Sequence, residues 1–176
     1  MPFSSKVDID QLKFIILTEL ESKLFLYVPI ERAKYYNNSK TWSSIINKFP
    51  SLEDNLIEAG NCFALARYTA CVVHLMRSLE TPLKVFGREV GVSIDVLNMN
   101  SWGQILVKIE NAVNNLKKDD QNKEYYSQLT SYFFILKNAW RNYTLHGNSK
   151  YTEEEADKIF NNCKAFIEKL AQRFKE

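Results

Sequence analysis

The stretch Ser51–Val90, SLEDNLIEAGNCFALARYTACVVHLMRSLETPLKVFGREV, carries the strongest helical pattern of the chain. Apolar side chains recur along it every three or four residues, the spacing that gathers them on one face of an α-helix. This stripe consists of Ile57, Cys62, Leu65, Ala66, Thr69, Val72, Val73, Met76, Leu79 and Leu83. Ser51 can cap the start of the segment, and Gly91 can terminate it. Pro82 falls inside the pattern and predicts a kink or a restart of the helix.

Helical patterns also lie on both sides of this stretch. A first helix is expected to begin near Asp8 or Asp10, and Ser101–Gln104 has the pattern of a capping box that opens another. A further helix is predicted from about 123 to 145, and Thr152–Glu155 opens the last one with a second capping box. Gly (5) and Pro (4) are scarce, whereas a β-sandwich or barrel needs many turns. We therefore predict an all-α fold, an antiparallel helical bundle.

Residues 1–48 are expected to form a small extension of the bundle, which is predicted to span residues 49–176. After the first helix, Leu24–Ile30 predicts a short strand that Pro29 stops, and a second extended piece is expected at Ala33–Tyr36. Together they predict a short two-stranded β-hairpin, packed with the first helix on the bundle. The chain of 176 residues is long enough for one domain with a single sizeable core.

Composition and motifs exclude several classes of protein. The 23 Lys and Arg against 21 Asp and Glu give a net charge of +2, so nucleic-acid binding must come from a local patch. Three cysteines without a CxxC pair predict neither a disulfide framework nor a metal site. The sequence has no glycine-rich phosphate loop, and no cofactor is predicted. Without a signal-peptide pattern or a long apolar run, we expect a cytoplasmic protein with reduced thiols and no membrane association.

Residues that can act on a phosphodiester gather near the end of the helix predicted at 123–145. Asn142 and His146 are four residues apart and share one helix face, and Arg141 lies beside them. Arginine keeps its charge and grips two phosphate oxygens at once. An imidazole with a pKa of about 6.5 exchanges protons near neutral pH. Lys137, one turn before Arg141, adds a second cation and hints at a groove for RNA.

The pattern Arg141-Asn142-x-x-x-His146 resembles the motif of the HEPN superfamily, whose RNase members carry Arg, a polar residue, three residues and then His. The stretches 58–80 and 140–156 resemble an uncharacterised bacterial branch of that superfamily, and the resemblance covers residues 49–174. It implies a metal-independent endoribonuclease in which the ribose 2′-hydroxyl attacks the adjacent phosphate. In such an enzyme His146 acts as general base or acid, Arg141 holds the phosphate and Asn142 assists. The resemblance further implies a homodimer and a role as toxin or phage-defence effector, with an antitoxin or another protein as partner.

A second polar cluster lies on the segment quoted first. His74, Arg77 and Glu80 recur every three residues, and Arg67 lies two turns before His74. One interpretation is that these side chains line the same cleft, as phosphate contacts or as support for the catalytic histidine. The other is an internal salt bridge between Arg77 and Glu80 over a hydrogen-bonded core histidine, because charges on an apolar stripe need partners.

The sequence leaves two functions open. One is the ribonuclease, and the other is a non-catalytic homodimeric interaction module that uses the same scaffold to bind a partner. An open cleft on which Arg141, Asn142 and His146 converge favours the enzyme, whereas burial of Arg141 against carboxylates favours the module. The aromatic residues around the motif are expected to belong to the core rather than to a base-stacking platform. They are Trp102, Tyr132, Phe133, Phe134 and Trp140.

Overall fold

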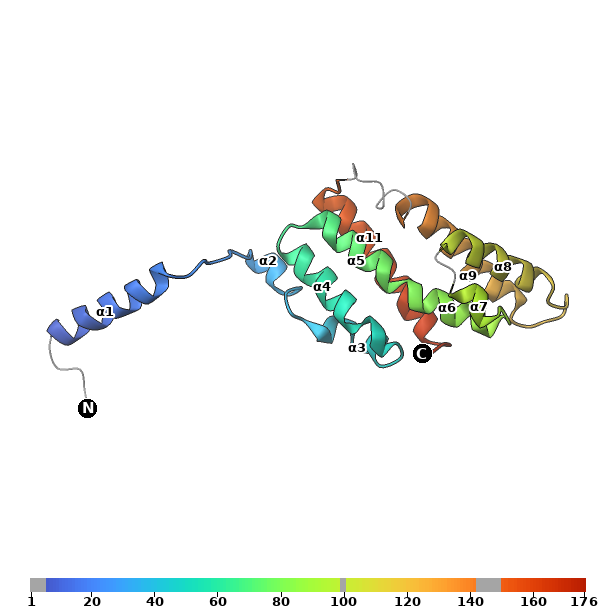
Figure 1. Ribbon diagram of the computed structural model, residues 1–176, viewed down its shortest axis with the longest axis horizontal. Helices are drawn as coiled ribbons and strands as arrows, with labels where there is room; N and C mark the ends of the chain where they lie inside the picture. The colour runs from blue at the N-terminus through green and yellow to red at the C-terminus, as the bar shows by residue number, and fades with distance from the viewer. Residues whose placement is uncertain (1–5, 99–100, 142–149) are drawn as a thin grey trace.

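Helices joined by short connections make up the described chain. The computed structural model describes residues 6–98, 101–141 and 150–176, and no strand occurs within these ranges. Figure 1 shows the helices packed side by side in a bundle, with α1 extending away from it. The all-α fold predicted from the sequence is confirmed. The elements are α1 (Lys6–Glu21), α2 (Ile30–Ala33), η1 (Ser39–Trp42), α3 (Ser43–Ile46), η2 (Pro50–Leu52), α4 (Glu53–Ala64), α5 (Tyr68–Ser78), α6 (Glu80–Glu89), α7 (Ile94–Leu97), α8 (Trp102–Asn114), α9 (Lys123–Leu136), η3 (Lys137–Arg141) and α11 (Glu153–Ala171).

The helices α4 and α5 form an antiparallel hairpin (Figure 1). After α4 ends at Ala64, Ala66 takes the left-handed conformation with a φ of 56°. The amide of Arg67 donates to the carbonyl of Cys62 at 2.7 Å, and the amide of Ala66 donates to that of Phe63 at 3.1 Å. These two hydrogen bonds form a Schellman motif, which ends a helix and lets the chain turn away. The predicted apolar stripe therefore lies on two helices rather than one. The break between them contains neither Gly nor Pro, the residues that usually mark the end of a helix.

A second division of the stretch falls where Pro82 predicts it. The helix α5 ends at Ser78, and α6 begins at Glu80. Pro82 thus occupies the first turn of α6, where a missing backbone N–H removes no helical hydrogen bond. Gly91, with a φ of 82°, follows the end of α6 and confirms the predicted termination.

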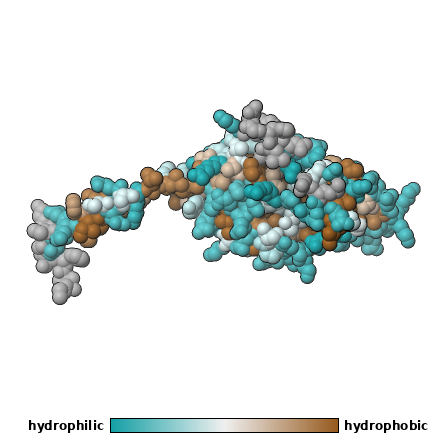
Figure 2. Space-filling view, in the orientation of Figure 1, coloured by the Kyte–Doolittle hydropathy of each residue, from teal (hydrophilic) through white to brown (hydrophobic). Residues whose placement is uncertain are grey.

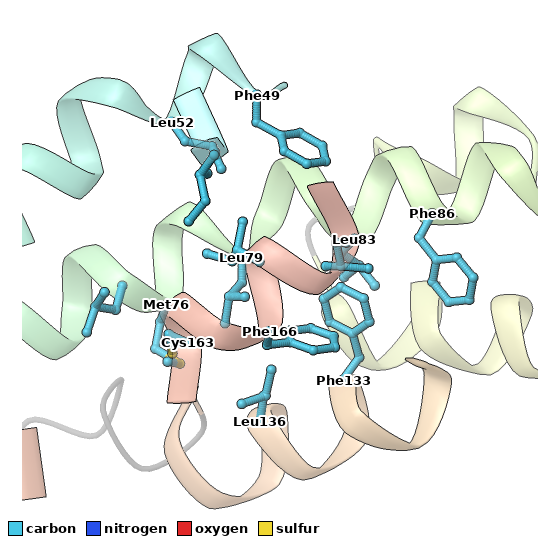
Figure 3. Close-up of a cluster of buried hydrophobic side chains, with 14 of the residues drawn as sticks. Phe49, Leu52, Met76, Leu79, Leu83, Phe86, Phe133, Leu136, Cys163 and Phe166 are labelled. Carbon is cyan, nitrogen blue, oxygen red and sulfur yellow. The ribbon is translucent and has the colours of Figure 1, made fainter. Parts of the chain in front are cut away.

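The last helix, α11, packs against α5 and supplies the centre of the core. Its predicted capping box is present: Thr152 accepts a hydrogen bond from the amide of Glu155, and the Glu155 carboxylate accepts one from the amide of Thr152 at 2.8 Å. Figure 3 shows Phe166 of α11 beside Phe133 of α9, and their ring centroids are 4.9 Å apart. At α8 the predicted start is correct, but the side chain of Ser101 makes no capping hydrogen bond.

The segment that follows α1 differs from the predicted β-hairpin. Residues 24–29 have no regular secondary structure, and the short helix α2 begins directly after Pro29. A strand needs a neighbour that satisfies its backbone donors and acceptors, and this apolar run has none in the described chain. Instead, Arg32 of α2 donates to the hydroxyl of Tyr68, which donates to Glu153 at 2.6 Å. These contacts join α2 to α5 and α11.

Residues beyond α2 pack closely on the bundle. The ring of Tyr35 lies between those of Phe63 and Phe160, with centroid distances of 4.9 and 5.4 Å. Its carbonyl oxygen approaches α4 at Gly60, where an added Cβ would lie 2.7 Å from that oxygen. Position 60 therefore accepts only glycine without a shift of the backbone.

The helix α1 does not pack on the bundle. Figure 1 shows it extending away, and Figure 2 shows apolar residues on the surface of the arm that it forms with residues 22–29. The exposed large apolar side chains of this N-terminal arm are Ile9, Leu12, Phe14, Ile15, Ile16, Leu17, Leu20, Leu24, Phe25, Leu26 and Tyr27. A helix that is apolar on most sides is normally covered by other protein. Neither α1 nor any other described helix has the length and apolar character that crossing a membrane requires.

We expect Ala66→Gly to raise the free energy of unfolding by about 0.5–1 kcal/mol. A residue with a Cβ in the left-handed conformation costs about 1–2 kcal/mol, which glycine avoids. The greater freedom of glycine in the unfolded chain offsets about 0.4–1 kcal/mol of this gain. Urea denaturation measures the difference. The control is Ala165→Gly, an exposed position within α11, where the same exchange lowers stability by about 1 kcal/mol. An equal loss at both positions would contradict the role assigned to Ala66.

Candidate functional site

Arg141 is the member of the predicted catalytic set that the structure describes. It ends η3, a π-helical turn that continues α9 from Lys137. Such turns interrupt the regular register of a helix and are frequent at functional sites. Asn142 and His146 lie outside the described residues. The convergence of the three side chains therefore stays a prediction, and the site is built from Arg141 and its neighbours.

The guanidinium of Arg141 lies over the indole ring of Trp102, with its central carbon 4.8 Å from the ring centroid. Trp102 is the first residue of α8 and is 2% exposed, and its ring packs edge-on against Phe133 at 6.1 Å. The buried indole N–H has no hydrogen-bond partner among the described residues. An arginine stacked on an aromatic ring gains a cation–π interaction, while its N–H groups remain directed outward in the guanidinium plane.

No carboxylate lies within salt-bridge distance of Arg141 in the described part of the chain. The described residues include every Asp and Glu of the chain, and none forms a salt bridge with this guanidinium. The negative charge of Glu80 acts on Arg141, but the salt bridge of Glu80 is with Lys84, at 3.1 Å. Partial burial holds the pKa of Arg141 below its usual value, and Glu80 opposes that shift. Arginine nevertheless stays protonated in proteins, so the end of η3 carries a half-buried cation.

Lys137 places a second cation beside the first. It begins η3, and its side chain extends over the start of α8, where an added Cβ at Gly103 would lie 3.4 Å from Lys137 Cε. Its ammonium donates to Asn138 Oδ1 at 3.2 Å. The two cations therefore lie over neighbouring residues of α8, Trp102 and Gly103. We call Lys137 and Arg141 the cationic patch.

Two pockets adjoin this end of the bundle, and Trp140 lines both. One, of about 460 Å³, has the polar side chains of Lys158 and Asn162 in its wall. The other, of about 410 Å³, is more apolar and is lined by Tyr132 and Ile135 of α9 opposite α11. We call this second pocket the apolar groove. Volumes of this size fall in the range of small-ligand sites, roughly 300–1,000 Å³. Trp140 lines both pockets, whereas Arg141 and Lys137 line neither.

The second polar cluster does not converge on one place. His74 is half-buried and faces α4, where its Nδ1 lies 3.2 Å from Asn55 Oδ1. Burial lowers its pKa below the usual value. Arg67 and Arg77 are exposed, and Glu80 pairs with the lysine one turn further on rather than with Arg77. His74 is therefore hydrogen-bonded but only half-buried, and the Arg77–Glu80 salt bridge of the second interpretation does not form in the described chain.

Three side chains of metal-ligating types meet between α4 and α5, a group that the sequence patterns did not predict. One ligand atom each from Glu58, Cys62 and His74 lies within 4.8 Å of the other two. Burial, together with the neighbouring Glu58, raises the pKa of the Cys62 thiol to about 11. The available signal was the four-residue spacing of Glu58 and Cys62. Because the third member comes from another helix, no known zinc-site spacing marked the group.

Comparisons with protein-family models, with curated proteins and with solved structures found no match to this chain. The functional proposal therefore rests on the residues described above and on the resemblance of the motif.

The stacking of Arg141 on Trp102 predicts a measurable coupling energy. Arg141→Ala and Trp102→Leu are combined in a double-mutant cycle. We expect the double variant to lose about 0.5–2 kcal/mol less unfolding free energy than the sum of the two single losses, which is the range of a cation–π contact. Chemical denaturation of the four proteins measures this value. Lys40→Ala replaces Arg141→Ala in the control cycle, since Lys40 is exposed on η1, which packs on α4. Additive losses in both cycles would contradict the stacking.

Proposed function

We propose that the protein is a metal-independent endoribonuclease of the HEPN type that acts as a toxin or phage-defence effector. The observation that carries the proposal is the state of Arg141. Its guanidinium lies on the ring of Trp102, and in the described chain no carboxylate forms a salt bridge with it. A guanidinium held by one face keeps its N–H edge for a bidentate phosphate contact. An arginine that merely fixed the turn would be expected to face a carboxylate.

In the proposed reaction the ribose 2′-oxygen attacks the adjacent phosphorus. The bond from phosphorus to the 5′-oxygen breaks, which leaves a 2′,3′-cyclic phosphate and a free 5′-hydroxyl. His146 takes the proton of the 2′-hydroxyl or gives one to the leaving oxygen. Arg141 binds the phosphate oxygens, whose negative charge must be stabilised in the transition state, and Asn142 assists. The roles of His146 and Asn142 come from the resemblance alone.

The proposal includes a homodimer. On a regular α-helix, residues 141 and 146 diverge by about 140°. A chain that continued from the π-helical turn in that register would not aim both side chains of one protomer at one phosphate. A two-fold partner brings the histidine of one chain near the arginine of the other. The apolar groove supports an interface beside the motif, because Tyr132 and Ile135 of α9 are 49% and 58% exposed. Apolar surface of this kind is covered when a second copy packs against it.

We expect Arg141→Ala and His146→Ala each to slow RNA cleavage by about 10²–10⁴-fold, because each removes a group that acts on the reacting phosphate. Purified protein is incubated with labelled RNA in EDTA, and the cyclic phosphate ends are quantified. Arg88→Ala is the control, since Arg88 is exposed on α6 and should leave the rate unchanged.

Two outcomes would contradict this reaction. Cleavage that stops in EDTA and returns with magnesium or manganese would show that the chemistry needs a metal. Cleavage at the wild-type rate by both variants would remove Arg141 and His146 from the site.

The second candidate function is a non-catalytic homodimeric interaction module, and the N-terminal arm favours it. The arm exposes apolar side chains on several sides of α1, with Phe14 and Ile15 at 69% and 57% exposure. Such a helix gains stability when it is covered. In this alternative, the arm of one copy packs on a second copy, and the chain binds partners without cutting RNA.

Light scattering on charged variants distinguishes the two interfaces. We expect Ile135→Glu to convert a dimer into a monomer, because it places a charge in an apolar contact, while Ile15→Glu leaves the dimer intact. The control is Val107→Glu, a comparably exposed apolar position on α8 outside the apolar groove. Dissociation by Ile15→Glu alone would locate the interface in the arm and favour the module. A monomeric wild-type protein at micromolar concentration would contradict both dimers.

A further inference from the structure

Glu58, Cys62 and His74 meet between α4 and α5 in an arrangement close to that of metal ligands. Glu58 and Cys62 are one turn apart on α4, and Glu58 Oε1 lies 3.6 Å from Cys62 Sγ. A ring nitrogen of His74 completes the group, with all three ligand atoms within 4.8 Å of one another. Bonds of about 2.0–2.3 Å in tetrahedral geometry place neighbouring zinc ligands roughly 3.4–3.6 Å apart. The pair on α4 already has that spacing, and the histidine needs a movement of about 1 Å.

Asparagine amides on α4 hold two of these three side chains. Asn61 Nδ2 donates to Glu58 Oε2 at 3.2 Å, and the other carboxylate oxygen is the one beside Cys62. Asn55 Oδ1 lies 3.2 Å from His74 Nδ1. In the tautomer in which Nδ1 donates to Asn55 Oδ1, Nε2 is the ring nitrogen with a lone pair for a metal. Partners of this kind orient metal ligands and fix the histidine tautomer.

The other two cysteines provide an internal comparison. Cys71 and Cys163 are buried in the core, and neither belongs to a comparable group in the described part of the chain. Burial raises the pKa of each of these thiols. Cys62 combines burial with a carboxylate oxygen at 3.6 Å and an imidazole nitrogen within 4.8 Å, which distinguishes it from a thiol that only fills space.

We propose that Glu58, Cys62 and His74 bind a zinc ion, with the fourth coordination position open to water. Sulfur, imidazole nitrogen and one carboxylate oxygen form a donor set that suits zinc, whereas magnesium and calcium take oxygen ligands. Binding requires the Cys62 thiolate, so the thiol proton passes to solvent. The ion joins α4 to α5 and stabilises the hairpin. The site lies on other elements than Arg141 and goes beyond the proposed ribonuclease, whose cleavage step uses no metal.

Cobalt titration of the full chain tests the site. The protein is first stripped of metal with a chelator and kept reduced, and Co²⁺ is then added while absorption is recorded. We expect one equivalent to produce a thiolate-to-cobalt charge-transfer band together with visible bands of four-coordinate cobalt, and Zn²⁺ to displace them. Cys62→Ser should abolish the charge-transfer band, whereas the control Cys163→Ser should retain it. Asn55→Ala should weaken cobalt binding by about 10–100-fold, the effect of losing an orienting partner.

Two results of the cobalt titration would overturn the proposed zinc site. Absence of a charge-transfer band from the wild-type protein, or its persistence in Cys62→Ser, would show that Cys62 binds no metal. If circular dichroism shows that Cys62→Ser fails to fold, His74→Gln decides, and an unchanged cobalt spectrum and affinity in that variant would refute the proposal. These readings do not depend on RNA cleavage, so the zinc site and the ribonuclease can fail separately.

Discussion

The reversal of the chain at Ala66 is the constraint on which the other contacts depend. The Schellman hydrogen bonds from Ala66 and Arg67 end α4 and let α5 start almost at once. The resulting antiparallel pair brings His74 to Glu58 and Cys62. The helix α5 also packs against α11 and reaches η3. A left-handed residue in one short turn thus determines both the centre of the core and the side chains that face each other across the hairpin.

A protein can hold a cation in two ways, and Arg141 is an example of the second. A carboxylate partner cancels the charge and satisfies the N–H groups, whereas an aromatic ring supports one face and leaves the charge uncompensated. Arg141 is held on the ring of Trp102 with Lys137 nearby, and the charge of Glu80 acts on it without forming a salt bridge. With a net charge of only +2, the chain has no general attraction for polyanions. The cationic patch can therefore provide a local positive field that the overall composition does not reveal.

Sequence patterns predicted the helices better than their breaks and contacts. Helical spacing and the box at Thr152 identified bundle helices correctly, because local propensity and tertiary packing agree there. The break at Ala66 was missed, since alanine gives no turn signal. The strand predicted at Leu24–Ile30 was wrong, because an apolar run needs a neighbouring strand that only the tertiary structure can supply. Trp102 was correctly assigned to the core, but its contact with Arg141 joins residues far apart in the sequence, which no local pattern encodes.

The position of α11 has a consequence for how the chain folds. During synthesis the α4–α5 and α8–α9 pairs are complete before α11 exists, and such local pairs close quickly. Their apolar faces, including that of Phe133, stay uncovered until Phe166 and its neighbours arrive to pack against them. The growing chain therefore passes through a stage with exposed apolar surface, in which aggregation competes with folding. A product that terminates before Thr152 remains in that state and becomes a substrate for chaperones and proteases.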